Sequence, residues 1–467
     1  MPITIDESRT YFQTIMPGPR VIALQFHGQN HTLQSYLSFY GTNLFGLSFL
    51  SLRLGSVLGF LIYVLGSIRL SRICSNTKWL FFLTLLTLTI NPVVLDFGVV
   101  ARGYSLALAF FMVALGQCAS RIARDQSTEK TRSTLIILSC LCSLTVLSNL
   151  SFAFATFSML AVFVFWILLE SRSWRRMVVD LLLVSVPGTV LFLLLNPAVF
   201  HFSMVTFYFG SASWWEFYES LTRIAFDSRN SRFNALPGVS LIRFLPLLLS
   251  LVVPAFVFLA FIPAIRNRKK MKEHAPNTRL WLFLSAVFSI TVLIHSFFHW
   301  VMSRPLPQDR TGLFLLPLAV LIITSSITGL DAIKQSSASS RILRQSSTIL
   351  LGALVVSFLL NVRLVWVYVW KFDSGGPEIS TFVSNYAREH DVGHVGTQWP
   401  LDQALRFYPA LRKDAYFPEL QELSLPSDAS RENLFVLHTR KSPFIEREKL
   451  KIIFEHPLSE VVVAVRQ

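Results

Sequence analysis

Charged side chains are scarce in this chain of 467 residues, because only 15% of its residues are Asp, Glu, Lys or Arg. A soluble domain usually carries about 25% of such residues. Hydrophobic residues make up 52% of the chain, and phenylalanine alone occurs 41 times. This composition excludes a soluble globular protein and predicts an integral membrane protein that crosses the bilayer many times.

Cysteine is also scarce, with four residues in the whole chain. All four, Cys74, Cys118, Cys140 and Cys142, lie in or beside apolar segments, so neither a disulfide framework nor a metal-ligand spacing is indicated. The sequence also lacks a nucleotide-sugar signature, a Walker loop and a zinc-binding motif. We therefore expect neither a metal nor a cofactor.

Acidic residues are outnumbered, since 42 Lys and Arg stand against 27 Asp and Glu and give a net charge of +15. The basic residues occur in short runs between apolar segments and do not form one polar patch. Orientation in a membrane explains such runs better than binding to a phosphate backbone does. We expect no nucleic-acid partner.

Apolar segments long enough to cross about 30 Å of hydrocarbon dominate the chain. They predict an all-α polytopic bundle of about ten spans. These lie near residues 44–68, 79–93, 103–119, 134–150, 152–169, 178–199, 239–264, 280–302, 311–330 and 346–369.

The loops between these spans differ in their basic residues. Loops 69–78, 120–132, 170–177, 265–279 and 331–345 carry three to six Lys or Arg each, whereas the alternate loops 94–102, 151, 200–238 and 303–310 carry none to three. The positive-inside rule makes the first set cytoplasmic. The N-terminal segment, the 200–238 loop and the tail therefore face outward. Residues 1–43 would then be exported with no hydrophobic segment ahead of them, and we expect that a first helix is missing from this sequence.

Three regions follow from this pattern: an outward N-terminal segment with an acidic motif (1–43), a multi-span domain (44–370) and an extracytoplasmic α/β domain (371–467). The tail shows a helical pattern after Gly375-Gly376-Pro377 and short β-rich runs at 434–437, 452–454 and 461–465. Within the 200–238 loop, Trp214, Phe217, Tyr218, Leu221, Ile224 and Ala225 share one helical face. This pattern fits either a helix in the membrane interface or a helix packed on protein as a lid.

Polar residues that can do chemistry gather in the segments expected to face outward. They are the pair Asp6-Glu7, the stretch Gln29-Asn30-His31-Thr32-Leu33-Gln34-Ser35-Tyr36-Leu37, Asp96, the run Ala101-Arg102-Gly103-Tyr104-Ser105-Leu106, and the pair Asp309-Arg310. Carboxylate, imidazole and guanidinium groups would thus meet at one membrane face.

Together with Leu52-Arg53-Leu54, these motifs resemble those of the bacterial GT-C membrane glycosyltransferases, the relatives of protein O-mannosyltransferases and of the lipid A aminoarabinose transferase. The resemblance lies in the order and spacing of the motifs from residue 6 to about residue 330, and the α/β tail suits the same group. Members of this family carry one transmembrane helix before the acidic pair, whereas this chain begins five residues ahead of Asp6.

The resemblance implies an inverting enzyme that transfers a monosaccharide from a polyprenyl-phosphate carrier. Such a reaction needs a base, a group that stabilises the departing phosphate, and a site at the bilayer surface. By its similar position in the family, Asp6 would be the base, with Glu7 as the next candidate. The alternative is that the pair caps a first helix or is simply solvated.

Arg102 is the expected phosphate ligand, because a guanidinium presents a bidentate fork to phosphate oxygens. It could instead anchor a helix end at the interface. Tyr104 would orient a sugar or acceptor, or serve in the aromatic belt.

His31 would assist proton transfer or bind the acceptor, or else make structural hydrogen bonds. Arg53 lies inside an apolar span and needs a carboxylate or phosphate partner, whether in a substrate site or in a structural ion pair. Asp309 and Arg310 would bind the donor or form an internal salt bridge.

The expected partners are a polyprenyl-phosphate-linked sugar donor, an envelope glycan, lipid or protein acceptor, and membrane lipids. The expected location is a bacterial inner membrane, with the site and the tail facing outward. A polytopic transporter or lipid flippase is the first alternative, although the spans contain few ionisable residues and no inverted repeat is visible. A noncatalytic membrane scaffold is the second, but it would not require acidic and basic residues collected on one face.

Overall fold

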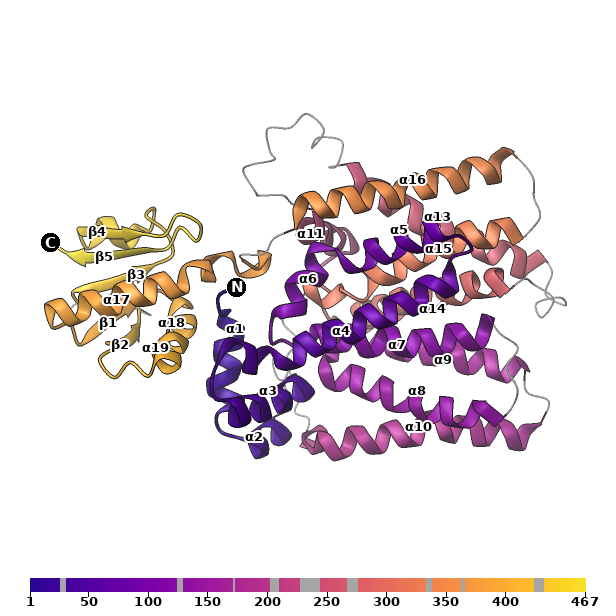
Figure 1. Cartoon of the computed structure of the whole chain (residues 1–467), viewed down its shortest axis with the longest axis horizontal. Helices are drawn as coiled ribbons and strands as arrows, with labels where there is room; N and C mark the ends of the chain where they lie inside the picture. Colours follow the sequence, from indigo (N-terminus) through magenta and orange to yellow (C-terminus); the bar gives the residue numbers. More distant parts are fainter. Residues whose placement is uncertain are drawn as a thin grey trace.

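The protein consists of a large helical bundle and a small α/β unit, joined by helices at one end of the bundle (Figure 1). The computed structural model describes residues 1–25, 31–123, 129–170, 173–201, 210–226, 244–266, 276–332, 338–362, 366–423 and 432–467. The long helices run side by side, and the α/β unit lies beyond the end of the bundle that carries the N-terminal helices (Figure 1).

The bundle is built from long apolar helices. They are α4 (Phe49–Cys74), α5 (Lys78–Thr89), α7 (Tyr104–Ala123), α8 (Glu129–Ser148), α9 (Ala153–Glu170), α10 (Trp174–Leu195), α13 (Phe244–Arg266), α14 (Pro276–Met302), α15 (Leu315–Ala332) and α16 (Ala338–Asn361). The predicted class, an all-α polytopic membrane protein with a small α/β tail, is confirmed.

The number of membrane-crossing helices is close to the prediction of about ten. In the described ranges, seven helices are long and apolar enough to cross a membrane, or eight when the bent pair of α5 and α6 (Pro92–Val99) counts as one span. Two shorter apolar helices, Arg132–Ser148 and Leu248–Ile262, lie where two further spans were expected.

Two element boundaries differ from the sequence-based expectation. The first expected span began at residue 44, but α3 (Thr32–Phe45) occupies that position and Gly46, with φ 75°, separates it from α4. The last expected span ran to residue 369, whereas α16 ends at Asn361. The last two residues of the expected span, 368 and 369, instead belong to the 3-10 segment η6 (Tyr368–Gly375).

Glycine allows α4 and α7 to pack closely. A Cβ atom on Gly59 would lie 2.7 Å from the backbone nitrogen of Leu106, and one on Gly66 would lie 3.2 Å from the Cβ atom of Met112. Small residues at a helix crossing let two backbones approach, which is the usual basis of association between helices in a bilayer. This crossing holds the start of α7 against α4, where several candidate residues lie.

Four short elements cover one end of the bundle. They are α1 (Ile5–Thr10), the π-helical turn η1 (Tyr11–Ile15), α2 (Pro19–Leu24) and α3. Thr4 caps α1 through a reciprocal capping box with Glu7, in which each side chain accepts a hydrogen bond from the other residue's backbone. Helix α11 (Trp214–Phe226) packs against α6, α13 and α16.

Helix α11 packs on protein through the face that the sequence singled out. Phe217, Leu221, Ile224 and Ala225 are buried, whereas Trp215 is exposed. The helix contacts the 3-10 turn η5 (Asp309–Gly312) at the entrance to α15. The sequence left open whether this helix lies in the membrane interface or packs on protein. Its buried face packs on protein.

The C-terminal unit is a five-stranded mixed sheet with helices around it. Its helices are α17 (Gly376–His390), α18 (Leu401–Leu405), α19 (Phe407–Arg412) and α20 (Pro443–Arg447), and its strands are β1 (His394–Thr397), β2 (Glu419–Glu422), β3 (Leu434–Leu437), β4 (Leu450–Glu455) and β5 (Val462–Arg466). The strand order is β2-β1-β3-β5-β4, with β1 parallel to both neighbours and the other pairs antiparallel.

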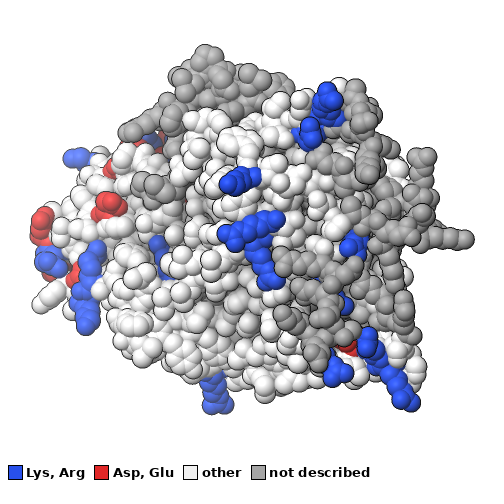
Figure 2. All heavy atoms as spheres, turned by 45° about the vertical axis from the view of Figure 1, so that its right-hand side comes forward, with Lys and Arg blue, Asp and Glu red and all other residues white. Residues whose placement is uncertain are grey.

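The surface of the bundle is apolar. On the face drawn in Figure 2, large areas carry no charged residue, and Lys and Arg are more numerous than Asp and Glu. Large apolar side chains such as Leu65, Trp79, Leu194 and Phe258 are exposed on the bundle helices. Exposed apolar side chains on long apolar helices are what contact with lipid requires, so the chain is an integral membrane protein.

Candidate functional site

The candidate residues lie at the end of the bundle that faces the C-terminal unit. They come from α1, the N-terminal half of α4, the turn between α6 and α7, the start of α3, and η5. These elements are far apart in the sequence but meet at one end of the bundle (Figure 1).

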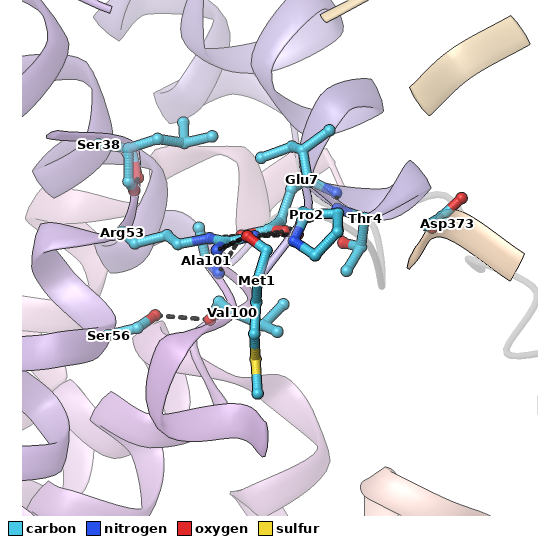
Figure 3. A network of polar contacts seen from close by, with 12 residues as sticks. Met1, Pro2, Thr4, Glu7, Ser38, Arg53, Ser56, Val100, Ala101 and Asp373 are labelled. Atoms are coloured by element: carbon cyan, nitrogen blue, oxygen red, sulfur yellow. Dashed lines mark hydrogen bonds and ion pairs between the residues drawn. The ribbon is translucent and has the colours of Figure 1, made fainter. Parts of the chain in front are cut away.

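Glu7 and Arg53 form a buried bidentate ion pair (Figure 3). Arg53 Nε donates to Glu7 Oε1 and Arg53 Nη2 donates to Glu7 Oε2, each at 2.8 Å. The same carboxylate accepts the backbone N–H of Thr4 at 2.9 Å and of Ala101 at 2.8 Å. Its side chain is 0% exposed. Four donors leave this carboxylate little capacity to accept a proton from a substrate.

Arg53 also holds the start of the chain. Its Nη1 donates to the carbonyl oxygen of Met1 at 2.9 Å, and its Nη2 donates to that of Pro2 at 2.6 Å. A charged group in an apolar span needs such partners. Both roles that the sequence left open for Arg53 require a carboxylate or phosphate partner, and Glu7 supplies a carboxylate.

Asp6, the neighbour of Glu7, has a different environment. Its Oδ2 lies 3.4 Å from Arg102 Nη2 and 3.6 Å from Arg310 Nη2, and its side chain is 21% exposed. These distances exceed the roughly 2.7–2.9 Å of a tight charge-assisted hydrogen bond. Asp6 is therefore held loosely between two guanidinium groups, at a position that solvent or a ligand can reach.

The turn that carries Arg102 depends on Gly103. Gly103 has φ 68°, and a Cβ atom there would lie 2.0 Å from the carbonyl oxygen of Ser148 and 2.9 Å from the Cβ atom of His31. Only glycine fits this backbone and this space. Arg102 itself is 4% exposed, and its Nη1 donates to Thr10 Oγ1 at 3.2 Å, so the turn holds this guanidinium against α1.

A row of aromatic side chains connects His31 and Tyr104 to Arg310. The ring centroids of His31 and Tyr104 are 5.7 Å apart, those of Tyr104 and Phe97 are 4.7 Å apart, and those of Phe97 and Trp370 are 5.9 Å apart. The guanidinium of Arg310 lies 4.9 Å from the centroid of Trp370. Asp6, Arg102 and Arg310 are called the Asp6 cluster below. This cluster, the adjacent pair of Glu7 and Arg53, and the aromatic row bring together every predicted site residue except Asp309.

Asp309 lies on the other side of η5. It borders a cavity between α11, η5 and the residues around η6, and its backbone N–H donates to Ser220 Oγ at 2.9 Å. The predicted pair Asp309-Arg310 is therefore divided, because Arg310 extends to Asp6 while Asp309 lines the cavity.

Sequence reasoning missed two residues of the C-terminal unit that contact α1. Asp373 Oδ2 accepts the backbone N–H of Ile5 at 2.7 Å, and Tyr408 Oη accepts that of Ile3 at 3.1 Å. Burial raises the pKa of the Asp373 carboxyl well above its usual range, and the negative charges of Asp6 and Glu7 raise it further. Neither residue belongs to a recognisable motif, so only the fold brings them to the site.

The chemistry available here is that of a carboxylate between two cations. In the part of the chain that the structure describes, no group of His, Cys, Asp and Glu side chains could hold a metal ion. The cluster offers two guanidinium groups for an anion and one accessible carboxylate for a proton.

Comparison with known proteins gives matches at the level of structure only. No family model matches the chain, and no curated protein matches it. Among solved structures, the chain is similar to ArnT from Cupriavidus metallidurans in the apo state, with 12% identity and a TM-score of 0.47 over 99% of this chain and 94% of that chain. It is also similar to the same enzyme bound to undecaprenyl phosphate, with 13% identity and a TM-score of 0.43 over 99% of this chain and 92% of that chain.

Proposed function

We propose that this protein is a membrane glycosyltransferase that moves a monosaccharide from a polyprenyl-phosphate carrier to an envelope acceptor. The observation that carries the proposal is the placement of Asp6 between Arg102 and Arg310, at an accessible end of an apolar helical bundle. A polyprenyl phosphate joins an apolar tail to an anion, and the protein combines an apolar helical bundle with two guanidinium groups at one end of it. The order of motifs shared with GT-C glycosyltransferases supports the same reaction.

The two guanidinium groups would exchange partners when the donor binds. In the free protein they neutralise Asp6 at 3.4 and 3.6 Å. Donor phosphate oxygens would replace the Asp6 carboxylate as the partner of both guanidinium groups, because a phosphate presents more acceptor atoms and a larger charge than a carboxylate. Asp6 would then be released toward the acceptor. The tight pair of Glu7 and Arg53 would not exchange, so we assign it to holding α1 in place.

Transfer would proceed by displacement at the anomeric carbon of the donor. The acceptor hydroxyl oxygen forms the new bond to this carbon, the bond between the carbon and the phosphate oxygen breaks, and polyprenyl phosphate leaves with the electron pair. The hydroxyl proton passes to the Asp6 carboxylate. Arg102 and Arg310 stabilise the charge that grows on the leaving phosphate. Attack opposite the leaving group inverts the anomeric configuration.

We further propose that this end of the bundle and the C-terminal unit face outward across a bacterial inner membrane. The basic residues that favour this orientation include Arg72 at the end of α4, Lys78 at the start of α5 and Arg344 in α16. An outward site suits a sugar donor whose carrier is a lipid, because such a donor diffuses in the bilayer.

Binding of decaprenyl phosphate to the purified protein in detergent, measured by native mass spectrometry, tests the proposal. The wild type should bind it more tightly than it binds uncharged decaprenol. Arg102→Ala should weaken phosphate binding by about tenfold or more, which corresponds to about 1.4 kcal/mol, and Arg102→Lys should restore only part of it, because a point charge replaces a fork.

Arg69→Ala is the matched control, because Arg69 is a partly buried arginine in the C-terminal half of α4 that donates to Gln117 at 3.1 Å and Ser120 at 3.0 Å. It should leave phosphate binding unchanged. Equal binding of decaprenol and decaprenyl phosphate, or equal losses in the Arg102 and Arg69 variants, would overturn the proposal.

A further inference from the structure

A cavity of about 490 Å³ lies between α11, η5 and the residues around η6. Its volume falls within the roughly 300–1,000 Å³ of ordinary small-molecule sites. No residue of the Asp6 cluster lines it. The cavity is therefore lined by other side chains and has its own chemistry.

The walls combine acidic, hydroxyl and aromatic groups. Glu216, Glu219 and Asp309 supply three carboxylates, Ser220 supplies a hydroxyl, and Tyr368 is one of the aromatic residues. Carboxylates accept hydrogen bonds from ligand hydroxyls, and a serine hydroxyl both donates and accepts. Aromatic side chains provide an apolar surface beside these polar groups. A sugar has the matching properties, because its ring carries hydroxyl groups at the edge and C–H groups on the faces.

An anionic ligand does not fit this cavity. Its two cations, Arg223 and Lys371, are outnumbered by three lining carboxylates, and Arg223 is bound to Glu219 at 2.7 Å, more tightly than Asp6 is bound to its arginines. The three lining carboxylates would repel a phosphate. The donor phosphate thus belongs with Arg102 and Arg310, and the cavity calls for a neutral polyhydroxylated ligand.

The cavity and the Asp6 cluster share two walls. In η5, Asp309 faces the cavity while the next residue, Arg310, contacts Asp6. In η6, Val369 and Lys371 face the cavity while Trp370 between them packs under Arg310. A ligand in the cavity would therefore lie next to the two segments that carry Arg310, which contacts the candidate base, and Trp370, which packs on Arg310.

We propose that this cavity is a saccharide subsite for the acceptor. Its role in transfer rests on the proposed function, whereas saccharide binding itself does not. The acceptor would then carry a glycan. One of its sugars would be held in the cavity, and the attacking hydroxyl, on another part of the acceptor, would lie on the Asp6 side of η5 and η6.

The local structure maintains the cavity. Asp309 has φ 46°, a conformation that Asp and Asn adopt more readily than other non-glycine residues. A Cβ atom on Gly312 would lie 2.2 Å from the ring of Phe217, so glycine is needed for α11 to pack this closely on η5. Asp96 Oδ2 accepts the backbone N–H of Tyr368 at 3.2 Å and fixes the wall on the η6 side.

Saturation-transfer difference NMR on the full-length protein in detergent tests this inference. The probes are methyl β-D-glucopyranoside, methyl α-D-mannopyranoside, methyl β-D-galactopyranoside and maltose at millimolar concentration. At least one probe should give a saturable signal. Asp309→Asn, which keeps the backbone conformation but replaces one acceptor oxygen with a donor, should weaken its binding by about fivefold, the usual worth of one hydrogen bond.

Glu419→Gln is the matched control, because Glu419 is a 73% exposed carboxylate on β2, outside the cavity. It should leave the signal unchanged. No signal from any probe, or equal effects of the Asp309 and Glu419 variants, would overturn the subsite. Arg102→Ala should retain the saccharide signal, so failure of the decaprenyl phosphate experiment with this signal intact would overturn the proposed function and leave the subsite standing.

Discussion

Asp6 and Glu7 are adjacent in the sequence but bind different arginines with different geometry. Glu7 holds Arg53 through two hydrogen bonds of 2.8 Å and is 0% exposed, whereas Asp6 lies 3.4 Å from Arg102 and is 21% exposed. A buried carboxylate with four donors is held in one position, whereas a loosely paired accessible one can exchange partners. Two adjacent positions of α1 thus have different environments, which the sequence alone could not distinguish.

Asp6→Asn should separate binding from chemistry. The substitution keeps the shape of the side chain but removes its proton affinity, so decaprenyl phosphate binding should persist. Turnover of a polyprenyl-phosphate sugar should fall by about 10²–10⁴-fold, the usual worth of positioned general-base catalysis. A radiolabelled transfer assay measures the turnover. Undiminished transfer would remove Asp6 as the base.

Glu7→Gln should act on stability rather than on one chemical step. It leaves the Arg53 guanidinium buried without its counter-ion, and breaking a buried pair from one side costs about 3–5 kcal/mol. Thermal unfolding in detergent should therefore shift strongly downward. The double variant Glu7→Gln, Arg53→Gln should lose less stability than the sum of the two single variants. A strictly additive result would show that the pair does not act as a unit.

Gly103→Ala should disrupt the turn that carries Arg102. The added methyl group would collide with the Ser148 carbonyl oxygen at 2.0 Å and force an unfavourable φ of 68°. We expect loss of folded protein, measured by size-exclusion chromatography after detergent extraction. Gly352→Ala is the control, because Gly352 lies in α16 with nothing within 4 Å of a Cβ atom. That substitution should be neutral or stabilising by up to about 1 kcal/mol.

Docking of the C-terminal unit on α1 should weaken as the pH rises. Burial and the nearby acidic residues raise the pKa of Asp373, so the docked state favours the protonated carboxyl. This contribution is fully present below the ordinary pKa of about 3.9 and is lost as the pH rises through the elevated value. Hydrogen exchange of peptides that contain the Ile5 amide, corrected for intrinsic rates, should show protection that falls with pH.

Asp373→Asn should remove this pH dependence, because the amide stays neutral and its oxygen can still accept the Ile5 N–H. It should also increase protection at neutral pH. Protection that rises with pH in the wild type, or an unchanged slope in the variant, would contradict the assignment of the effect to Asp373.

Orientation can be tested with two single cysteines introduced into a variant without the four native ones. A cysteine at Glu419, in the C-terminal unit, should react with a membrane-impermeant maleimide in intact cells. A cysteine at Arg344, exposed on α16, should react only after the membrane is permeabilised. The opposite pattern would reverse the proposed orientation. The loop around Lys270, the most basic in the sequence, lies outside the described residues.

Local chemistry explains which features the sequence predicted. Strand β3 occupies the β-rich run at 434–437. All four of its residues are buried, and a short run of consecutive apolar residues is typical of a strand that is covered on both faces. The length of the apolar segments likewise predicted the helical bundle. The end of α16 was missed because the apolar pattern continues past Asn361 although the helix does not.

The candidate site was predictable as a set of residues but not as a set of partners. Arg53 needed a counter-ion, and its position in an apolar span indicated this. The choice of Glu7 over Asp6 depends on α1 docking against α4, a contact between distant segments. The contacts of Asp373 with Ile5 and of Tyr408 with Ile3 join segments that are still further apart in the sequence, and they depend on the fold of the C-terminal unit.

The hydrogen bond between Ile3 and Tyr408 spans 405 positions of the chain. A ribosome that adds about 5–20 residues per second would therefore finish Tyr408 roughly 20–80 s after Ile3. Throughout that interval the segment that begins α1 lacks its contact with Tyr408, while the bundle inserts span by span. Assembly of this end of the protein is thus a late event in biosynthesis, and a chain that terminates before Tyr408 would contain the bundle helices but not the hydroxyl that binds the Ile3 N–H.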